Sequence, residues 1–174
     1  MDLTDFFNER LEIARSLTAR GELSLVNTFN TDLPRIFVVA SASHFETVVA
    51  SHIRNFFAEM SNGHPAVIEF VDKKVLFRSY HTLFNWPSNS VSSFFAMFGK
   101  LCADHYKQLS KDQDWLSEAA RAFLQLGQAR NELVHGDFAT HSPSLTAPEV
   151  QAAFISAQRF VESIPLILRM KELS

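Results

Sequence analysis

Apolar side chains recur every three or four residues through five segments of the chain, which is the spacing of one face of an α-helix. Residues 66–82 could be strand or helix by periodicity alone, and the flanking segments favour helix. Helices that each bury one face must pack on one another, so the sequence predicts an all-α antiparallel bundle of four to five helices plus short helices. The long helices are expected at about residues 3–27, 33–61, 90–109, 148–169 and, for about 22 residues, from Trp115 onward.

Proline, glycine and small polar residues mark the expected ends of these helices. Gly21 can interrupt the first helix. Thr31 or Asp32 followed by Pro34 is a helix-start signal, because a proline in the first turn loses no hydrogen bond that it could have made. Pro165 is expected to kink or shorten the last helix. Polar loops or linkers are expected at 85–90, 110–113 and 140–148.

The length and composition of the chain fit one compact domain over residues 1–174. A chain of this size can bury roughly 70% of its unfolded surface, enough for a core without disulfides. The N-terminal helix, about residues 1–28, could lie at the periphery. Hydrophobic residues make up 47% and charged residues 20% of the chain, which excludes a disordered protein. No apolar run reaches the roughly 18 residues of a membrane helix, so we expect a soluble protein without a membrane partner.

The N-terminal charge and the cysteine content both favour a cytoplasmic location. Asp2 and Asp5 carry acid where a secretory signal carries base, so export is not expected. Cys102 is the single cysteine, which rules out an internal disulfide and a cysteine-based metal cluster. We expect it to pack as a small hydrophobic residue in a reducing compartment.

The segment from Arg130 to Gly136 carries the side chains best suited to chemistry. Asn131 and His135 are four residues apart on the predicted helix, so the amide can orient the imidazole. Arg130 lies roughly 140° around the helix from His135, but its long stem can bring the guanidinium, whose fork suits a phosphate, into the same groove. Gly136 is expected to end the helix as a left-handed cap, which places His135 near the negative end of the helix dipole and favours imidazolium. A proton carrier, a fixed cation and a neutral donor are the parts that cleave a phosphodiester without a metal, although such residues at a helix end are also typical of solvated surface.

With its flanks, this segment resembles the RNxxxH signature of the HEPN superfamily, small helical proteins of which many are metal-independent ribonucleases. The resemblance is to the RiboL-PSP-HEPN branch and covers roughly residues 30–170. It rests on the order and spacing of three pieces, which are the segment Ile36–Glu46, the pair Trp115–Leu116 and the close Arg130–Gly136.

The resemblance implies an active-site set of three residues, Arg130, Asn131 and His135. It also implies Glu46 as a polar residue on an earlier helix that faces them. His44, two residues before Glu46 on the same helix, is a supporting candidate by its position. Glu46 in an apolar environment is more typical of an ion pair than of a base, and its expected partner is Arg54 or Arg130. A pair with Arg130 would hold the guanidinium in place.

Attack by a ribose 2′-hydroxyl on the adjacent phosphate needs both a base and an acid, and the motif has one histidine. HEPN proteins form homodimers, and a dimer that packs two motif helices together would let one His135 act as base and the other as acid. Two Arg130 side chains would stabilise the phosphorane. We therefore predict an RNA substrate, a homodimer, no metal and no cofactor. Products would carry a 2′,3′-cyclic phosphate or a 5′-hydroxyl, and DNA would not be cut.

The remaining histidines and the loop aromatics fit structural roles better than catalytic ones. His52 shares the helix face of His44, which lies two residues before Glu46, but eight residues put the two histidines about 12 Å apart, which makes a weak metal site. Other histidines fall in loops or at helix ends, namely His64, His81, His105 and His141. Three aromatic residues in or beside loops could stack on bases, although core or subunit contact is favoured: Phe84, Trp86 and Phe138.

The charge of the chain argues partly against an RNA-cleaving enzyme. A net charge of −3 and a pI near 6.1 are poor for holding a long polyanion. Three explanations stay open: a positive groove at the dimer seam, a small or delivered substrate, or no nuclease activity. The alternatives are a catalytically inactive HEPN-like dimerisation or nucleotide-binding module, and a helical adaptor without a site. HEPN proteins often belong to toxin–antitoxin or phage-resistance systems, which implies an antitoxin or regulatory partner protein.

Overall fold

The computed structural model describes residues 2–77, 79–136 and 143–173, and within these ranges the chain is helical without a strand. The predicted all-α bundle is confirmed. The α-helices are α1 (Leu3–Ala19), α2 (Leu23–Met60), α3 (Pro65–Phe70), α4 (Ser92–Ala96), α5 (Lys100–Asp112), α6 (Asp114–His135) and α7 (Ala147–Leu168).

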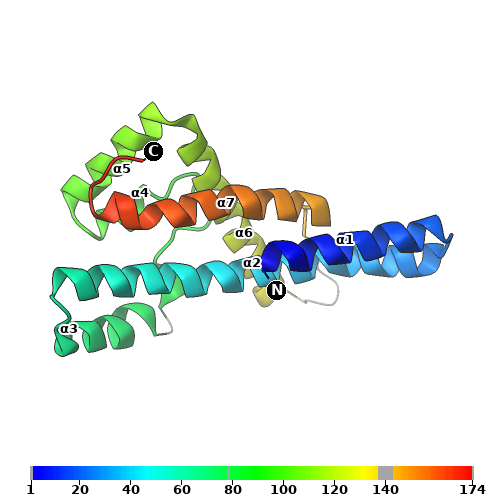
Figure 1. Ribbon diagram of the computed structural model, residues 1–174, viewed down its shortest axis with the longest axis horizontal. Helices are drawn as coiled ribbons and strands as arrows, with labels where there is room; N and C mark the ends of the chain where they lie inside the picture. The colour runs from blue at the N-terminus through cyan, green and yellow to red at the C-terminus, as the bar shows by residue number, and fades with distance from the viewer. Residues whose placement is uncertain (1, 78, 137–142, 174) are drawn as a thin grey trace.

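The long helix α2 runs through the whole molecule (Figure 1). The helices α1, α3, α6 and α7 pack against it, whereas α5 packs against α6 and α7, and α4 against α5. The helix α1 folds back on the N-terminal part of α2, and α3 folds back on its C-terminal end. Both α6 and α7 pack against α2 and against each other, which makes these three helices the centre of the bundle. The side of α2 that faces them is apolar and buried, with Phe37, Phe45, Val49 and Ile53 almost without exposed surface.

Phenylalanine rings join the helices into one core. Phe45 of α2 lies with its ring centroid 5.1 Å from that of Phe154 in α7 and 5.7 Å from that of Phe123 in α6. The ring of Phe7 in α1 is fully buried, 4.2 Å from Phe37. The N-terminal helix therefore contributes a ring to the same core.

The first break between helices falls at Gly21, so the predicted start of a helix at Thr31 or Asp32 is wrong. Gly21 has φ +75°, a left-handed conformation that glycine adopts without strain. Pro34 lies inside α2 and is buried. A proline within a helix destabilises it by about 3 kcal/mol or more. Burial of one large side chain, such as the fully buried ring of Phe37, contributes about 1.5–3 kcal/mol. Packing of a few such side chains can therefore offset the cost of Pro34 and keep α2 continuous.

The segment between α2 and α5 is more broken than the sequence predicts. Residues 65–76 form α3 and a π-helical turn, Val71–Leu76, and a 3₁₀ turn follows at Tyr80–Thr82. The single helix expected at about 90–109 is split at Gly99, which has φ +103°, a conformation that strains any residue with a Cβ. Because α5 continues to Asp112, the expected linker at 110–113 is reduced to Gln113.

The two helices α6 and α7 agree closely with the prediction. The 22 residues of α6 end within the motif, and α7 begins one residue before Pro148. Thr146 caps α7, since Glu149 accepts hydrogen bonds of 2.7 Å from both the backbone N–H and the hydroxyl of Thr146. Pro165 does not break the helix, which ends three residues later.

One helix of the described chain, α2, is long and apolar enough to cross a membrane by length and composition alone. An 18-residue window of α2 has a mean hydropathy of 1.3. No uninterrupted apolar run of this length occurs in α2, as expected, because polar residues are scattered along it; the window passes on its mean hydropathy. The packing of α2 against α1, α6 and α7 is that of the core helix of a bundle, which passes the same test.

Candidate active site

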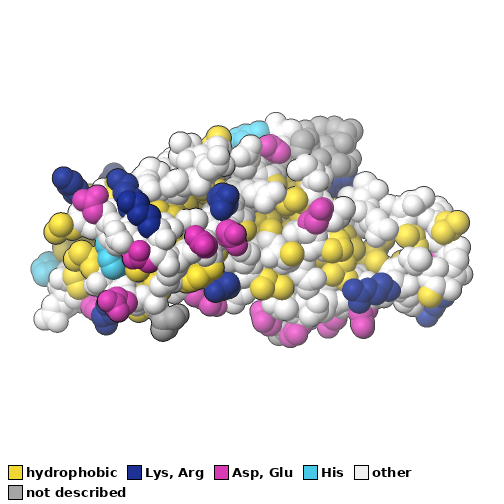
Figure 2. Space-filling model, turned by 90° about the horizontal axis from the view of Figure 1, so that it is seen from above, with side chains coloured by type: hydrophobic (Ala, Val, Ile, Leu, Met, Phe, Trp, Pro, Cys, Tyr) yellow, Lys and Arg dark blue, Asp and Glu magenta, His cyan; other side chains and the backbone are white. Residues whose placement is uncertain are grey.

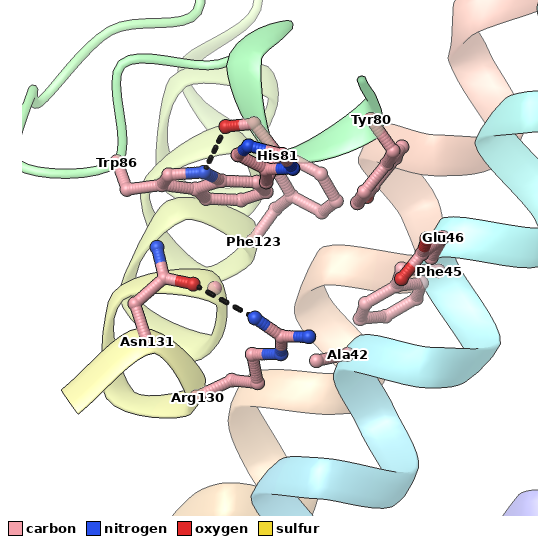
Figure 3. A pocket seen from close by; sticks show the side chains of 10 residues that line it. Ala42, Phe45, Glu46, Tyr80, His81, Trp86, Phe123, Arg130 and Asn131 are labelled. Atoms are coloured by element: carbon pink, nitrogen blue, oxygen red, sulfur yellow. Dashed lines mark hydrogen bonds between the residues drawn. The ribbon is translucent and has the colours of Figure 1, made fainter. Parts of the chain in front are cut away.

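A pocket lies where the middle of α2, the segment Tyr80–Trp86 and the C-terminal half of α6 meet (Figure 3). Its volume is about 90 Å³. Aromatic rings form much of its wall, and charged and polar groups reach it from three directions. The lining residues are Ala42, Phe45, Glu46, Tyr80, His81, Trp86, Phe123, Gly127, Arg130 and Asn131.

Helical spacing explains why these residues share one pocket. On α6 the lining residues are 123, 127, 130 and 131, which follow the i, i+4, i+7, i+8 pattern of one helix face. On α2 they are 42, 45 and 46, again on one face. The two faces meet through the contact of Phe45 with Phe123. The motif residues Arg130 and Asn131 therefore open onto the same space as Glu46.

The guanidinium of Arg130 points from α6 into the pocket (Figure 3). Its Nη1 donates a hydrogen bond of 3.3 Å to the side-chain oxygen of Asn131. In the ranges that the structure describes, no carboxylate forms an ion pair with Arg130. The guanidinium of Arg130 is thus held by a neutral partner, and its positive charge can still pair with a bound anion.

Tyr80 brings a buried phenol to the pocket, with 8% of its surface exposed. Burial raises the pKa of Tyr80, the negative charge of Glu46 raises it further, and the positive charge of Arg130 partly opposes the two. The phenol therefore stays protonated. It can donate a hydrogen bond, but it does not serve as a base near neutral pH.

The indole of Trp86 is fixed in the pocket wall by two contacts. Its Nε1–H donates a hydrogen bond of 2.8 Å to the backbone carbonyl of His81. The ring also rests directly on Gly127 of α6, where a Cβ atom would come within 2.0 Å of the indole. Only glycine at position 127 leaves room for this placement of the ring.

His135 lies outside the pocket. It is exposed in the last turn of α6, and among the described residues it forms no hydrogen bond with Asn131. Asn131 instead accepts from Arg130. The expected left-handed cap at Gly136 is wrong, since this residue has φ −88° and ψ −179°, an extended conformation that any residue adopts. The chain therefore leaves α6 in an extended direction immediately after His135.

Glu46 lines the pocket opposite Arg130, but the ion pair expected from the sequence is not formed. The expected partner Arg54 binds Asp72 instead, with 3.2 Å between nitrogen and oxygen. Among the described residues, Glu46 forms no ion pair within 4.0 Å. Since Glu46 is exposed at the pocket rim and not buried in apolar surroundings, water can solvate it without a partner. His44 does not line the pocket, and its ring packs edge-on against Phe154.

The remaining candidates divide between core and pocket. Phe84 is buried and stacks on Phe94 with 4.6 Å between ring centroids, as expected for a core residue. Trp86 is half-buried and lines the pocket. Phe138 and His141 lie outside the described residues. Within those residues, no group of three or more His, Cys, Asp or Glu side chains could hold a metal ion. Cys102 is buried, which raises the pKa of its thiol.

Sequence reasoning did not place Tyr80, His81 or Gly127 in the site. Periodicity relates residues on one helix and says nothing of which irregular turn covers it. Gly127 gave a usable signal, because a glycine inside a helix costs about 1 kcal/mol relative to alanine and often marks a close approach. That signal pointed to something packed on α6 one turn before the motif.

Acidic and basic side chains are interspersed on the face of the molecule shown in Figure 2, and they do not gather there into one basic patch. This agrees with the net charge of −3. On this face the protein offers no electrostatic track for a long nucleic acid.

The model of one protein family, described as RiboL-PSP-HEPN, matches residues 4–169 of the chain. Comparisons with curated proteins and with solved structures gave no match. The matched range extends from α1 to the end of α7. It begins further toward the N-terminus than the range of roughly residues 30–170 expected from the sequence.

Proposed function

Because the chain belongs to the RiboL-PSP-HEPN family, we propose that this HEPN-type module is a metal-independent endoribonuclease. One observation carries the proposal. Arg130 reaches a pocket with its charge unmatched by any carboxylate among the described residues, and His135 stands exposed one turn further along the same helix. An anion-binding guanidinium and an accessible imidazole on one helix are what phosphodiester cleavage requires.

The proposed reaction uses the ribose of the RNA as nucleophile. A base removes the 2′-hydroxyl proton, the oxygen attacks the adjacent phosphorus, and the bond to the 5′-oxygen breaks as that oxygen takes a proton from an acid. Arg130 stabilises the charge that develops on the phosphorane, and Asn131 holds the guanidinium. The products are a 2′,3′-cyclic phosphate and a 5′-hydroxyl end.

We further propose that base and acid are the His135 side chains of two subunits in a homodimer. The surface around the motif supports an isologous contact, since Val134 is 53% exposed beside His135. On α2, Ile36 and Val39 also keep about 40% of their surface exposed. Exposed apolar residues are typical of a protein interface, and Val134 is the one that lies in the motif segment itself.

By analogy with other HEPN proteins, the biological role would be that of a cytoplasmic toxin or phage-defence effector held in check by an antitoxin or regulatory protein. A second function is favoured by the pocket itself. Its aromatic wall and its convergent polar groups suit a nucleotide, so a catalytically inactive nucleotide-binding module is the alternative.

The test is cleavage of total RNA by the purified protein in the presence of EDTA, with His135→Ala as the comparison. Cleavage that survives chelation, disappears in the variant and leaves 2′,3′-cyclic phosphate ends supports the proposal. Equal cleavage by both proteins would reveal a contaminant. Absence of cleavage by the unaltered protein would favour the nucleotide-binding module.

A further inference from the structure

We propose that the pocket between α2, the Tyr80–Trp86 segment and α6 binds one unpaired nucleobase of the RNA and prefers guanine. The inference rests on the proposed function, because it assigns a substrate to the same site. It goes further in naming which part of the RNA is recognised, by which side chains, and in which structural state.

Trp86 provides a preformed surface for stacking. Its nitrogen is tied to the His81 carbonyl and its ring is seated on Gly127, so little conformational freedom is left to lose on binding. Figure 3 shows the indole on one side of the pocket and the guanidinium of Arg130 on the other. A flat ring between an indole and a guanidinium gains stacking from both faces.

The pocket is more than a water site and is bounded by aromatic rings. Its volume of about 90 Å³ is several times what a single buried water molecule needs. The buried rings of Phe45 and Phe123 close its floor, and the buried Tyr80 closes one side. A flat ring that enters between these walls is in contact with aromatic side chains on more than one side.

Glu46 supplies the preference for guanine. A carboxylate accepts hydrogen bonds through both oxygens, and Glu46 has no ion-pair partner among the described residues to satisfy them. Guanine presents two adjacent donors, N1–H and the N2 amino group, on one edge, whereas uracil presents one and adenine and cytosine present only an amino group. The paired donors of guanine therefore match the carboxylate best.

Recognition through that edge requires the base to be unpaired. The same N1–H and N2 amino groups are used in Watson–Crick pairing, so a base in a duplex cannot offer them. Sequence-specific RNA recognition commonly targets splayed-out bases in loops and single strands. This mode also explains how a chain with net charge −3 can select RNA, because one captured base replaces a long basic track.

Tryptophan fluorescence tests the inference directly. The chain has two tryptophans, and in Trp115→Phe the remaining indole, Trp86, reports on the pocket. Three probes are compared. Two are uncleavable 2′-O-methyl pentanucleotides of uridine with either guanine or adenine at the central position. The third is the guanine pentanucleotide annealed to its complement. We expect quenching with at least tenfold tighter binding of the guanine probe than of the adenine probe or the duplex. Equal affinity for the three probes would overturn the inference.

Two variants separate the stacking surface from the guanine contact. Gly127→Ala pushes the indole off α6 and should weaken binding of the guanine probe at least tenfold, while circular dichroism shows an intact helix content. Glu46→Gln should bring the affinities for guanine and adenine within about threefold, since the amide offers a single acceptor oxygen. Gln128→Ala, exposed on the same helix, is the matched control and should bind like the parent protein. Unchanged binding in Gly127→Ala would contradict the inference.

The same measurements distinguish failure of the pocket from failure of the enzyme. If the guanine probe binds as expected but RNA is not cut in EDTA, the proposed nuclease is wrong and the base pocket stands. If RNA is cut but Gly127→Ala and Glu46→Gln cut it at the same sites and rates, the nuclease stands and the base pocket is wrong.

Discussion

The two ends of the motif lie in different surroundings, although Asn131 and His135 are only four positions apart. Arg130 and Asn131 are half-buried in a pocket and joined to each other by a hydrogen bond. His135 is exposed at the end of α6, outside that pocket. Within one protomer, Arg130 and Asn131 already lie together in the pocket, whereas His135 lies apart from the other candidate residues that the structure describes.

This difference indicates that binding and proton transfer are separable in this protein. The pocket end can hold a ligand without help from another subunit. The exposed end needs a second surface to become a site, which is what the proposed homodimer would provide. Substitutions at the two ends should therefore have different signatures, and the following predictions compare them from the largest effect to the smallest.

His135→Ala should give the largest loss. Because it removes the proposed proton carrier and no pocket contact, we expect RNA cleavage to fall by about 10³-fold. Binding of the 2′-O-methyl guanine probe should stay within about twofold of the parent. Single-turnover cleavage and fluorescence titration measure the two quantities. His64→Ala, another exposed histidine remote from the motif in sequence, is the control; an equal loss there would argue against a specific role for His135.

Arg130→Lys should lower the cleavage rate by about 10²-fold, because the ammonium keeps the charge but loses the two-pronged contact with phosphate. Unlike His135→Ala, it should also weaken binding of the probe, since Arg130 lines the pocket. Arg121→Lys, on an exposed part of α6, is the matched control. Full activity of Arg130→Lys would remove the phosphate role from the proposal.

Val134→Asp tests whether the exposed end needs a partner subunit. A charge in the proposed interface should shift the protein to monomers and lower cleavage about tenfold at low protein concentration, with recovery as the concentration rises. Analytical ultracentrifugation and rate measurements over the same concentration series check this. Leu101→Asp, exposed on α5, should have neither effect. A monomeric variant that cuts RNA at the parent rate would show that one protomer suffices.

His52 should give the smallest effect, on stability and not on catalysis. Its Nε2 is buried without a hydrogen-bond partner among the described residues, and its pKa is lowered by burial and by Arg169, with Glu162 opposing. Because the unfolded chain takes up this proton at higher pH than the folded chain, stability is complete above about pH 6.5 and falls as the pH drops below it.

We expect the Tm to be lower at about pH 5.5 than at about pH 7.5, with the share due to His52 no more than about 4 °C, which corresponds to roughly 1 kcal/mol in a chain of this size. His52→Leu should reduce that difference. The measurement separates loss of folding in acid from loss of RNA cleavage in the folded protein. An unchanged pH dependence in the variant would assign the acid sensitivity to other groups.

Much of the fold could be predicted from the sequence where local signals agree. In α6 the apolar stripe, the length and the end of the helix point the same way. Around Pro34 they conflict, and packing decides for a continuous helix. Near Gly99 the apolar stripe predicts one continuous helix. The helix is broken there because Gly99 adopts a positive φ, which the apolar pattern does not indicate.

The candidate site could be predicted only in part. Helical spacing brings Arg130 and Asn131 to one face, and the family resemblance adds Glu46 opposite them, as found in the pocket. Tyr80 and His81 belong to a short 3₁₀ turn whose position is set by tertiary packing, so no periodic pattern connects them with α6. Arg130 lies in the pocket and His135 outside it because of the way α6 crosses the neighbouring helices. The spacing of residues along one helix does not determine that crossing.

The length of α2 has a mechanical consequence. Its 38 residues make a rod about 57 Å long, and the pocket draws on residues near its middle. A rotation of about 10° between two subunits around the motif would displace the tips of this rod by about 5 Å. In the proposed homodimer, probes attached at Gly21 and Gly63, the turns at either tip of α2, would therefore report a small change of angle between the subunits as a large change in distance.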